Sequence, residues 1–473
     1  MSDCCAGNGK GYDLAVIGAG SAGFSAAITA AEQGASVALI GHGTIGGTCV
    51  NVGCVPSKAL IRAMESVHQA GAAARFDGIR ANGGVTDWEA LVAQKDALVS
   101  GLRQAKYADL LPAYNNISYL EGAARLADGG VMVNGAVVRA PKLIIATGTR
   151  PGVPAVPDIE SIDYLTSTTA LDLKDLPKSL IVVGGGFVGV ELAQVFARAG
   201  VKVTIACRSR LLPAAEPELS EALAKYFVQE GITVVGGIAY ECCQKTDAGV
   251  ELSVRKGDRL EVLAAEKILV ATGRRPNVEQ LGLAEAGIRQ SQSGAIVVDD
   301  RMRTSRKGTY AAGDVTGRDQ FVYMAAYGAK LAAMNALNSD SLVYDNSTMP
   351  EVVFTDPQVA SVGLTEAAAK AAGHVVATSV LSLDNVPRAL AARDTRGLIK
   401  LVADAKTRKL IGAHILAPEG ADSIQTAAMA IKFGMTVEQL GEMIFPYLTT
   451  VEGLKLAAQT FNKDVKMLSC CAG

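Results

Sequence analysis

The N-terminal part of the chain alternates short apolar runs with an alanine-rich segment. Residues 12–17 form an apolar run that ends in glycines, as buried parallel strands do. Residues 21–33 are rich in alanine, which has the strongest helix propensity, and Gly34 can end a helix there. Residues 36–40 are apolar again. This order predicts a strand, a helix and a second strand, the unit from which parallel nucleotide-binding sheets are built.

The same pattern returns in the middle of the chain. Apolar runs at residues 180–183 and 201–206 flank a helical segment at 188–198, which Gly200 can close. Two such units predict two nucleotide-binding domains. The proline-rich residues 151–157 between them suit a domain boundary.

The pattern changes after residue 341, and no dinucleotide motif follows. Before that point, residues 143–147 and 268–272 are apolar strands ending in Ala-Thr-Gly, where we expect the chain to pass from one domain to the next. The predicted fold class is α/β, with two Rossmann-like nucleotide-binding domains and a C-terminal α+β domain. The elements predicted in the C-terminal domain are antiparallel strands at Val352, 399–402 and 411–415 and helices near 422–434 and 436–443.

Composition limits the function more than it limits the fold. Of the 473 residues, 49% are apolar and 19% are charged, and the net charge is -2, so a large core can form and no basic excess indicates nucleic acid. The sequence contains no basic amphipathic helix suited to a membrane surface and no apolar run long enough to span a bilayer. Its polar N-terminus does not resemble a signal peptide. We therefore expect a cytoplasmic protein whose nine cysteines are thiols, metal ligands or redox catalysts.

The first glycine motif is Gly18-Ala19-Gly20-Ser21-Ala22-Gly23, between the first predicted strand and helix. Its glycines permit a tight turn and let a pyrophosphate approach the helix N-terminus. The acidic residue that usually binds the ribose after the second strand is missing, because Gly41 stands there. The ribose must therefore bind another group, either main chain or water.

The second glycine motif contains Gly184, Gly186 and Gly189. The strand that follows its helix ends in Cys207-Arg208-Ser209-Arg210, with two arginines and no carboxylate. A guanidinium suits a phosphate, so Arg208 and Arg210 favour NADPH over NADH. The alternative is that both arginines are ordinary solvated side chains.

A third motif carries candidate redox chemistry. Residues 46–58 read G-G-T-C-V-N-V-G-C-V-P-S-K, with Cys49 and Cys54 close to a predicted helix start. A helix N-terminus favours the thiolate, which serves both as a nucleophile and as a ligand of soft metal ions. A purely structural disulfide is improbable in a cytosolic protein.

With these residues, the chain resembles the pyridine nucleotide–disulfide oxidoreductases over residues 12–461. The resemblance implies that Cys54 lies nearest the flavin of FAD, that Cys49 exchanges with substrate, and that Lys58 and Glu191 form an ion pair beside the flavin ring. Motifs at residues 271–277 and 309–314 also match, with Asp314 on the ribityl chain. The residues implied to contact FAD are Gly18, Gly20, Gly23, Gly47, Thr48, Lys58, Thr147, Gly148 and Asp314, and those implied to contact NADPH are Gly184, Gly186, Gly189, Glu191, Arg208 and Arg210.

The resemblance also implies a domain organisation and a partner. It places a discontinuous FAD-binding domain at residues 1–150 and 271–345, an NADPH-binding domain at 151–270 and a dimerisation domain at 346–473. In this family two subunits build the active site together, so a homodimer is expected.

Two departures from the family pattern bear on the substrate. Disulfide reductases carry a catalytic histidine in His-Pro-x-x-x-Glu; Glu452 remains here, but Tyr447 replaces the histidine. A phenol with a pKa near 10 cannot replace imidazole at neutral pH. The chain also ends with adjacent Cys470 and Cys471, which can capture a soft ion. Both features resemble the branch of the family that reduces mercuric ion.

This resemblance implies that Hg(II) passes from Cys470 and Cys471 to Cys49 and Cys54 and is reduced with electrons from NADPH through FAD. Tyr447 and Tyr107 are implied to line the inner metal site; for Tyr107 the alternative, a tyrosine on a helix surface, is nearly as well supported. Two other functions stay open: an NADPH-dependent reductase of a small organic disulfide, and a non-catalytic flavoprotein that binds thiophilic metals.

The remaining cysteines receive structural interpretations. Cys4 and Cys5 suit a disordered tail better than a metal scavenger. Cys207, Cys242 and Cys243 are predicted to be packing thiols.

Overall fold

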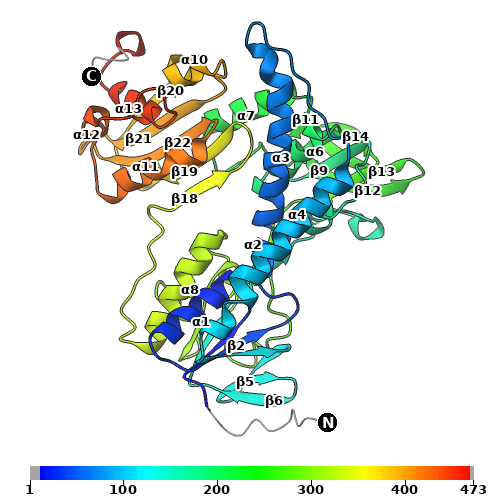
Figure 1. Cartoon of the computed structure of the whole chain (residues 1–473), viewed down its shortest axis with the longest axis vertical. Coiled ribbons are helices and arrows are strands. Elements are labelled where there is room, and N and C mark those ends of the chain that lie inside the picture. The colour runs from blue at the N-terminus through cyan, green and yellow to red at the C-terminus, as the bar shows by residue number, and fades with distance from the viewer. Residues whose placement is uncertain (1–10, 155, 469–473) are drawn as a thin grey trace. The chain divides into compact units, whose positions relative to one another are not determined.

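The computed structural model describes residues 11–154 and 156–468. Contacts within the chain divide it into two compact units, whose helices and strands are labelled in Figure 1. The first unit comprises Met1–Pro56, Ala93–Gly152 and Gly273–Asp345, and the second comprises Ser57–Val92, Val153–Thr272 and Asn346–Gly473. The predicted nucleotide domain at 151–270 and the predicted C-terminal domain therefore group in one unit, and the three predicted domain boundaries remain predictions.

The first unit is built on a five-stranded parallel sheet in the order β17-β7-β1-β2-β3. The predicted strand–helix–strand unit is confirmed as β1 (Leu14–Ile17), α1 (Ser21–Glu32) and β2 (Val37–Gly41). All residues of β1 and β2 are buried, because both faces of a parallel sheet are covered. The other strands of this sheet are β3 (Ile117–Glu121), β7 (Lys142–Ile145) and β17 (Thr309–Ala311).

Smaller elements complete the first unit. Helix α8 (Val322–Leu337) packs against α1. The other elements of this unit are the antiparallel strands β4 (Ala124–Ala127), β5 (Gly130–Val133) and β6 (Ala136–Arg139), the pair β8 (Thr149–Pro151) and β16 (Arg274–Pro276), and helix α2 (Gly47–Val52). Helices α3 (Cys54–Ala72) and α4 (Trp88–Arg103) each contain residues of both units. Of these elements, the sequence predicted only a helix start near the two cysteines.

The second unit contains a four-stranded parallel sheet in the order β11-β10-β9-β15. The second predicted strand–helix–strand unit is confirmed as β9 (Ser179–Val183), α6 (Phe187–Arg198) and β10 (Lys202–Cys207). The remaining elements of this part are α5 (Ser167–Leu171), α7 (Pro217–Gln229), β11 (Thr233–Gly236), the antiparallel strands β12 (Ala239–Thr246), β13 (Gly249–Lys256) and β14 (Arg259–Ala265), and β15 (Lys267–Val270).

The C-terminal part of the second unit contains the predicted antiparallel sheet, whose strands lie in the order β18-β19-β22-β21-β20. Helix α11 packs on β19 and β22, and α13 packs on β20 and β21. The elements are β18 (Pro350–Val353), β19 (Gln358–Gly363), α9 (Glu366–Ala371), β20 (Val376–Ser382), α10 (Pro387–Ala391), β21 (Leu398–Asp404), β22 (Leu410–Ala417), α11 (Gly420–Lys432), α12 (Val437–Glu442) and α13 (Glu452–Gln459).

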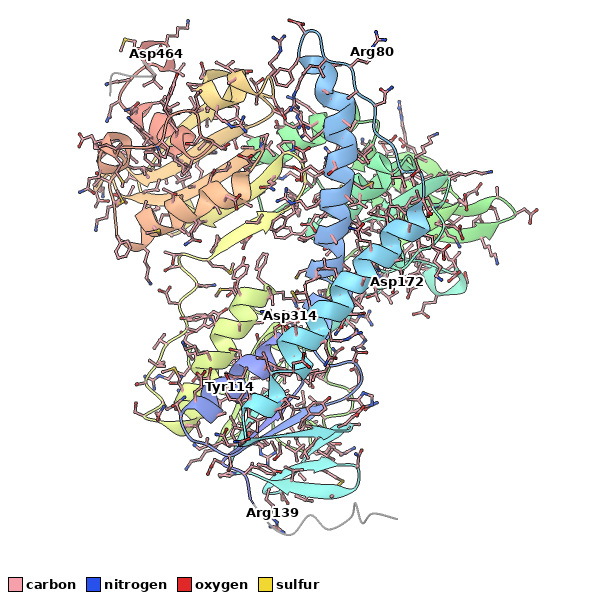
Figure 2. All side chains as sticks on the ribbon, viewed as in Figure 1. Arg80, Tyr114, Arg139, Asp172, Asp314 and Asp464 are labelled. Carbon is pink, nitrogen blue, oxygen red and sulfur yellow. The ribbon has the colours of Figure 1, made fainter. Side chains whose placement is uncertain are left out.

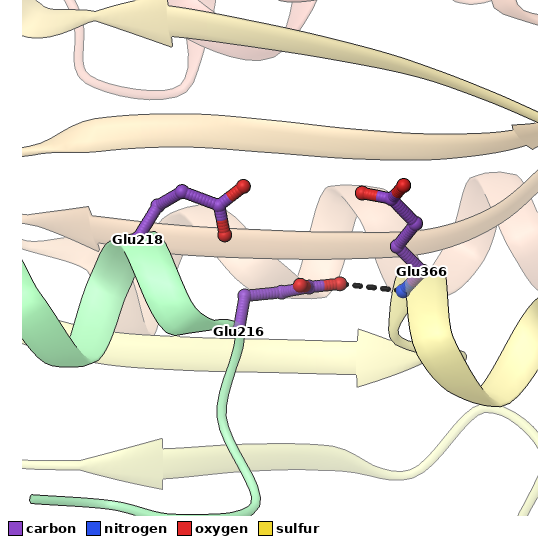
Figure 3. A group of neighbouring side chains, drawn as sticks. All are labelled: Glu216, Glu218 and Glu366. Carbon is purple, nitrogen blue, oxygen red and sulfur yellow. Dashed lines mark hydrogen bonds between the residues drawn. The ribbon is translucent and has the colours of Figure 1, made fainter. Parts of the chain in front are cut away.

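A partly buried ionic cluster joins the two parts of the second unit. Glu216 and Glu218 at the start of α7 face Glu366 at the start of α9, and their oxygens have the spacing of a metal site (Figure 3). The Lys400 ammonium, on a side chain that is 2% exposed, lies 3.1, 2.8 and 2.9 Å from these three carboxylates. The position between the carboxylates is therefore already held by a cation of the chain itself, and the cluster carries no metal interpretation.

In the part of the chain that the structure describes, none of the helices combines the length and apolar character needed to cross a bilayer.

Candidate active site

The glycine loop after β1 contacts the loop that precedes the cysteines. The Gly46 N–H donates to the Ala19 carbonyl oxygen at 2.8 Å. A Cβ on Gly47 would lie 2.6 Å from Gly20 Cα, and Gly47 has φ +68°, so glycine is required there. The two loops therefore form one surface of bare main chain at the start of α1. A pyrophosphate can approach N–H groups on such a surface, which fits the predicted FAD site.

Cys49 and Cys54 lie at two successive helix starts. Cys49 is half-buried in the first turn of α2, and Cys54 is the exposed first residue of α3. Asn51 fixes the turn between them: its Nδ2 donates to the carbonyl oxygens of Ile45 and Gly47, both at 2.9 Å, and its Oδ1 accepts from Arg103 at 3.1 Å. This bracing presents two thiols at helix N-termini, an arrangement that favours thiolates.

Tyr107 lies beside this cysteine pair. It belongs to a π-helical turn (Gln104–Ala108), packs edge-on against Phe24 at 4.9 Å between ring centroids, and places Oη 3.1 Å from Ser21 Oγ. Burial is the main cause that raises the pKa of its phenol, and the nearby charges of Cys49 and Cys54 raise it further. Tyr107 is therefore a half-buried neutral phenol next to the thiols. From the sequence alone, a tyrosine on a helix surface was nearly as well supported.

Asp314, labelled in Figure 2, is held by the antiparallel strands β8 and β16 of the first unit. Thr149 Oγ1 donates to Asp314 Oδ2 at 2.9 Å, and Arg274 Nε donates to Thr149 Oγ1 at 2.7 Å. Next to them, Thr147 Oγ1 donates to the Asn277 carbonyl oxygen at 2.7 Å, and Asn277 Nδ2 donates to the Thr147 carbonyl oxygen at 2.9 Å. These contacts fix the carboxylate that the sequence assigned to the ribityl chain.

The second glycine loop repeats the close packing of the first. A Cβ on Gly189 would lie 2.2 Å from the Gly184 carbonyl oxygen, so the helix start again lies directly on the loop. Beyond β10, Arg208 is exposed and can reach a ligand. Arg210 instead donates Nη2 to the carbonyl oxygens of Pro213 and Ala215, at 3.0 and 2.7 Å, and so braces the loop. The two arginines, which were treated alike from the sequence, thus have different surroundings.

Lys58 and Glu191 form the predicted ion pair, with Nζ 2.7 Å from Oε2. The Glu191 side chain is 7% exposed and that of Lys58 is 32% exposed. Phe354, at the end of β18, completes the group: its N–H donates to Glu191 Oε1 at 2.8 Å, and its ring lies 4.8 Å from Lys58 Nζ. Both oxygens of the carboxylate are therefore occupied, which fixes the orientation of the pair.

The same face of α6 holds the segment after Phe354. Gln194 Oε1 accepts from the Asp356 N–H and its Nε2 donates to the Asp356 carbonyl oxygen, both at 2.8 Å. One turn later, Arg198 binds the Asp356 carboxylate at 2.9 Å and Glu230 at 2.8 Å. Residues 191, 194 and 198 share one helix face. They form a continuous set of contacts that positions Glu191.

Tyr447 follows α12 and is 52% exposed. Glu452, at the start of α13, is 5% exposed and accepts the Leu448 N–H at 3.1 Å. Several large apolar side chains are also exposed in this C-terminal part of the second unit, as on surfaces that bind another protein. They are Met429, Phe433, Met443, Ile444 and Leu448.

None of the four histidines lies near Tyr447 in the sequence, and the structure places each in other surroundings. His42 is exposed after β2. His68 Nε2 lies 3.9 Å from Asp356, and His374 Nδ1 lies 2.9 Å from Asp404. His414 is 1% exposed, with Nε2 3.1 Å from the Leu364 carbonyl oxygen. No other histidine of the chain therefore replaces, next to Tyr447 in the sequence, the catalytic histidine of the disulfide reductases.

The other cysteines have the surroundings of packing residues. Cys207 and Cys243 are 3% and 1% exposed, and burial is the main cause that raises the pKa of both thiols, to about 11 for Cys243. Cys242 is half-exposed and lies beyond a bulge in β12. Cys4, Cys5, Cys470 and Cys471 lie outside the described residues, so their predicted roles remain predictions.

Several residues of the site were not anticipated from the sequence. Asn51 and Arg274 belong to the sequence motifs at residues 46–58 and 271–277, so their place in these motifs could have identified them as site residues. Arg103, Thr149, Gln194 and Phe354 had none, because their contacts join segments far apart in the chain.

Residues 12–333 match the family model described as pyridine nucleotide-disulphide oxidoreductase, and residues 349–458 match its dimerisation domain. Among curated proteins, the mercuric reductase of Streptomyces lividans is 47% identical over 98% of this chain and 99% of its own length. That of Shigella flexneri is 48% identical over 99% of this chain and 84% of its own length.

Solved structures agree with these matches. The Cu(II) complex of the HOCl-induced flavoprotein disulfide reductase RclA from Escherichia coli superimposes with a TM-score of 0.84. It is 29% identical and covers 96% of this chain and 100% of its own. From these matches and the thiol and glycine motifs described above, the chain belongs to the pyridine nucleotide-disulphide oxidoreductase family.

Proposed function

We propose that this chain reduces Hg(II) to elemental mercury with electrons from NADPH, as a mercury-detoxifying enzyme. The observation that carries the proposal is the combination of an intact thiol pair, Cys49 and Cys54, with a tyrosine in place of the family's catalytic histidine. Reduction of an organic disulfide needs an acid–base group to protonate the leaving thiolate. A metal ion bound by two thiolates needs none. Relatives with 47% and 48% identity over nearly the whole chain bear the name mercuric reductase.

The chain is an oxidoreductase whose cofactors are FAD and NADPH. The bare main chain around Gly20 and Gly47 and the braced carboxylate of Asp314 suit FAD, and the loop from Gly184 to Gly189 suits the dinucleotide NADPH. Bound there, FAD would supply a two-electron relay between NADPH and the cysteine pair.

In the proposed reaction, Cys49 and Cys54 bind Hg(II) as a dithiolate, because soft sulfur ligands suit a soft ion. Two electrons from one NADPH reduce the ion, NADP⁺ and one proton are released, and both thiolates dissociate from the neutral metal. Lys58 and Glu191 hold a fixed charge pair where the hydride arrives. The phenol of Tyr107, whose pKa is raised by burial, and that of Tyr447 from a second subunit line the metal site.

Delivery of the ion completes the proposal. We propose that Cys470 and Cys471 of one subunit pass Hg(II) to Cys49 and Cys54 of the other, by stepwise thiolate exchange that never releases a free cation. This transfer requires a homodimer, which the matched dimerisation domain supports. We place the reaction in the cytoplasm, where cellular thiols supply the complexed ion.

The test is NADPH oxidation by the purified holoenzyme with three acceptors: Hg(II) complexed by a small thiol, oxidised glutathione and lipoamide. We expect turnover with mercury and release of mercury vapour in a 1:1 ratio to NADPH consumed. The thiolate-to-flavin charge-transfer band formed on NADPH titration should disappear when Hg(II) is added. Rapid turnover with either organic disulfide and none with mercury would refute the proposal, and no turnover with any acceptor would indicate a metal-binding flavoprotein.

A second prediction concerns the nucleotide. Arg208→Ala is expected to raise KM for NADPH about ten-fold and to change KM for NADH less than about two-fold, because a charge-assisted hydrogen bond to the 2′-phosphate is lost. Steady-state kinetics with both nucleotides check this, with Arg259→Ala, an exposed arginine on β14, as the matched control. If KM for NADPH and KM for NADH changed by the same factor, the 2′-phosphate would not bind Arg208.

A further inference from the structure

The end of strand β2 lacks the carboxylate that commonly binds the adenosine ribose of a dinucleotide. Gly41 occupies that position. The structure shows that the space is not empty. A Cβ built on Gly41 would lie 2.5 Å from the Tyr119 hydroxyl, 2.8 Å from its ring carbon Cε2 and 2.8 Å from Ala19 Cβ. A side chain at position 41 and the ring of Tyr119 therefore exclude each other.

Tyr119 reaches this place from the neighbouring strand. It stands on β3, paired with Leu39 of β2, and its side chain crosses the last residues of β2 toward the glycine loop. The Tyr119 hydroxyl therefore lies 2.5 Å from the point where the side chain of an acidic residue at position 41 would begin, at the carboxyl edge of the sheet. Ligands of such sheets bind at this edge.

The Tyr119 hydroxyl is also available to a ligand. The residue is half-buried, and burial followed by the charge of Glu121 raises the pKa of its phenol, with no hydrogen bond contributing. The group therefore remains protonated at physiological pH and can both donate and accept a hydrogen bond. Ribose hydroxyl groups offer the same two functions.

We infer that Tyr119 binds the adenosine ribose of FAD and replaces the missing carboxylate at position 41. The contact is a neutral hydrogen bond between the phenol and one ribose hydroxyl. The inference rests on FAD as the cofactor and does not depend on mercury as the substrate.

The direct test is titration of FAD into apoprotein, with FAD fluorescence as the readout and neither NADPH nor mercury present. Tyr119→Phe is expected to bind FAD about three- to ten-fold more weakly than the unmodified protein, the range expected for one neutral hydrogen bond. Tyr12→Phe is the matched control, because Tyr12 is half-buried before β1, at the opposite end of the same sheet. Its affinity should not change.

A second titration identifies which hydroxyl of the adenosine ribose binds Tyr119. FAD analogues that lack the 2′- or the 3′-hydroxyl of the adenosine ribose should bind the unmodified protein more weakly for one of the two hydroxyls. Tyr119→Phe should lose that discrimination, since the partner group is absent. If Tyr119→Phe binds FAD as tightly as the unmodified protein and discriminates the analogues equally, the inference is wrong. Loss of discrimination in Glu121→Gln, and not in Tyr119→Phe, would assign the ribose to the carboxylate next to Gly41 on β3 and would equally overturn it.

If Tyr119→Phe folds poorly, the inference can still be tested by replacing the phenol of Tyr119 with a carboxylate at position 41. Tyr119→Val combined with Gly41→Glu removes the ring and restores an acidic residue, whereas Tyr119→Val alone leaves neither group. Both variants also carry Ala19→Gly, because Ala19 Cβ would lie 2.8 Å from a Cβ at position 41. We expect the variant without Gly41→Glu to lose FAD affinity and the variant with it to regain the affinity to within about three-fold. Full affinity of the variant without Gly41→Glu would overturn the inference. These outcomes are separate from the mercury assay, which can fail while FAD binding follows this prediction.

Discussion

Replacement of Cys54 by alanine is expected to abolish mercury-dependent NADPH oxidation, with a loss of at least about a thousand-fold in turnover, or about 4 kcal/mol in activation free energy. The remaining thiol can still bind the ion, but one sulfur neither forms the dithiolate nor relays two electrons. Reduction of the flavin by the first equivalent of NADPH should persist, because this step precedes the thiols. Stopped-flow spectra should therefore show a reduced flavin without the thiolate charge-transfer band.

Cys242→Ala is the matched control for this experiment, because Cys242 is a half-exposed thiol on β12 of the second unit. Its turnover should remain within about two-fold of the unmodified enzyme, as for a surface substitution. Residual mercury reduction above one per cent of the normal rate in Cys54→Ala would contradict the assigned role of the pair.

Lys58→Met is expected to slow reduction of the flavin by NADPH by on the order of 10- to 100-fold, because a small displacement of positioning groups has this cost. The substitution leaves the Glu191 carboxylate, 7% exposed, with the Phe354 N–H as its remaining partner described above. We expect the free energy of unfolding to fall by about 1–3 kcal/mol. This is less than for a fully buried pair, because Lys58 is 32% exposed.

Single-turnover kinetics at saturating NADPH check the rate, and denaturant unfolding checks the stability. Lys174→Met is the matched control: it breaks the pair with Glu89, whose side chains are 72% and 68% exposed, and should change neither quantity measurably. A normal rate of flavin reduction in Lys58→Met would show that the pair serves stability alone.

Much of this site could be predicted from the sequence, because its chemistry is concentrated in short motifs. Cys49 and Cys54, with Lys58 four residues later, stand in one continuous string, and the glycine loops follow directly after apolar strands. Helix and strand patterns depend on nearby residues, so both strand–helix–strand units and the strands β18, β21 and β22 of the C-terminal antiparallel sheet were predicted to within a few residues. Strands β19 and β20 of that sheet were not predicted. The antiparallel strands after β3 were missed, since short strands of mixed polarity have no clear period.

The sequence alone also determined the feature that separates the proposed reaction from disulfide reduction. Tyr447 stands at the position of the family's histidine, and this substitution is visible without any coordinates. The type of a side chain largely determines the pH range in which it can exchange protons. A phenol is therefore unsuited to the role of imidazole at neutral pH.

Only the tertiary structure decided which distant residues surround these motifs. Tyr107 lies beside the thiols, the main chain of Phe354 holds Glu191, and Lys400 fills the carboxylate cluster. Tyr119 occupies the space at Gly41, and Arg210 braces a loop where the sequence suggested a phosphate ligand. The physical reason is common to all five. Each contact joins groups whose distance is set by strand register, helix packing or the path of a loop, and no local pattern of polar and apolar residues specifies it.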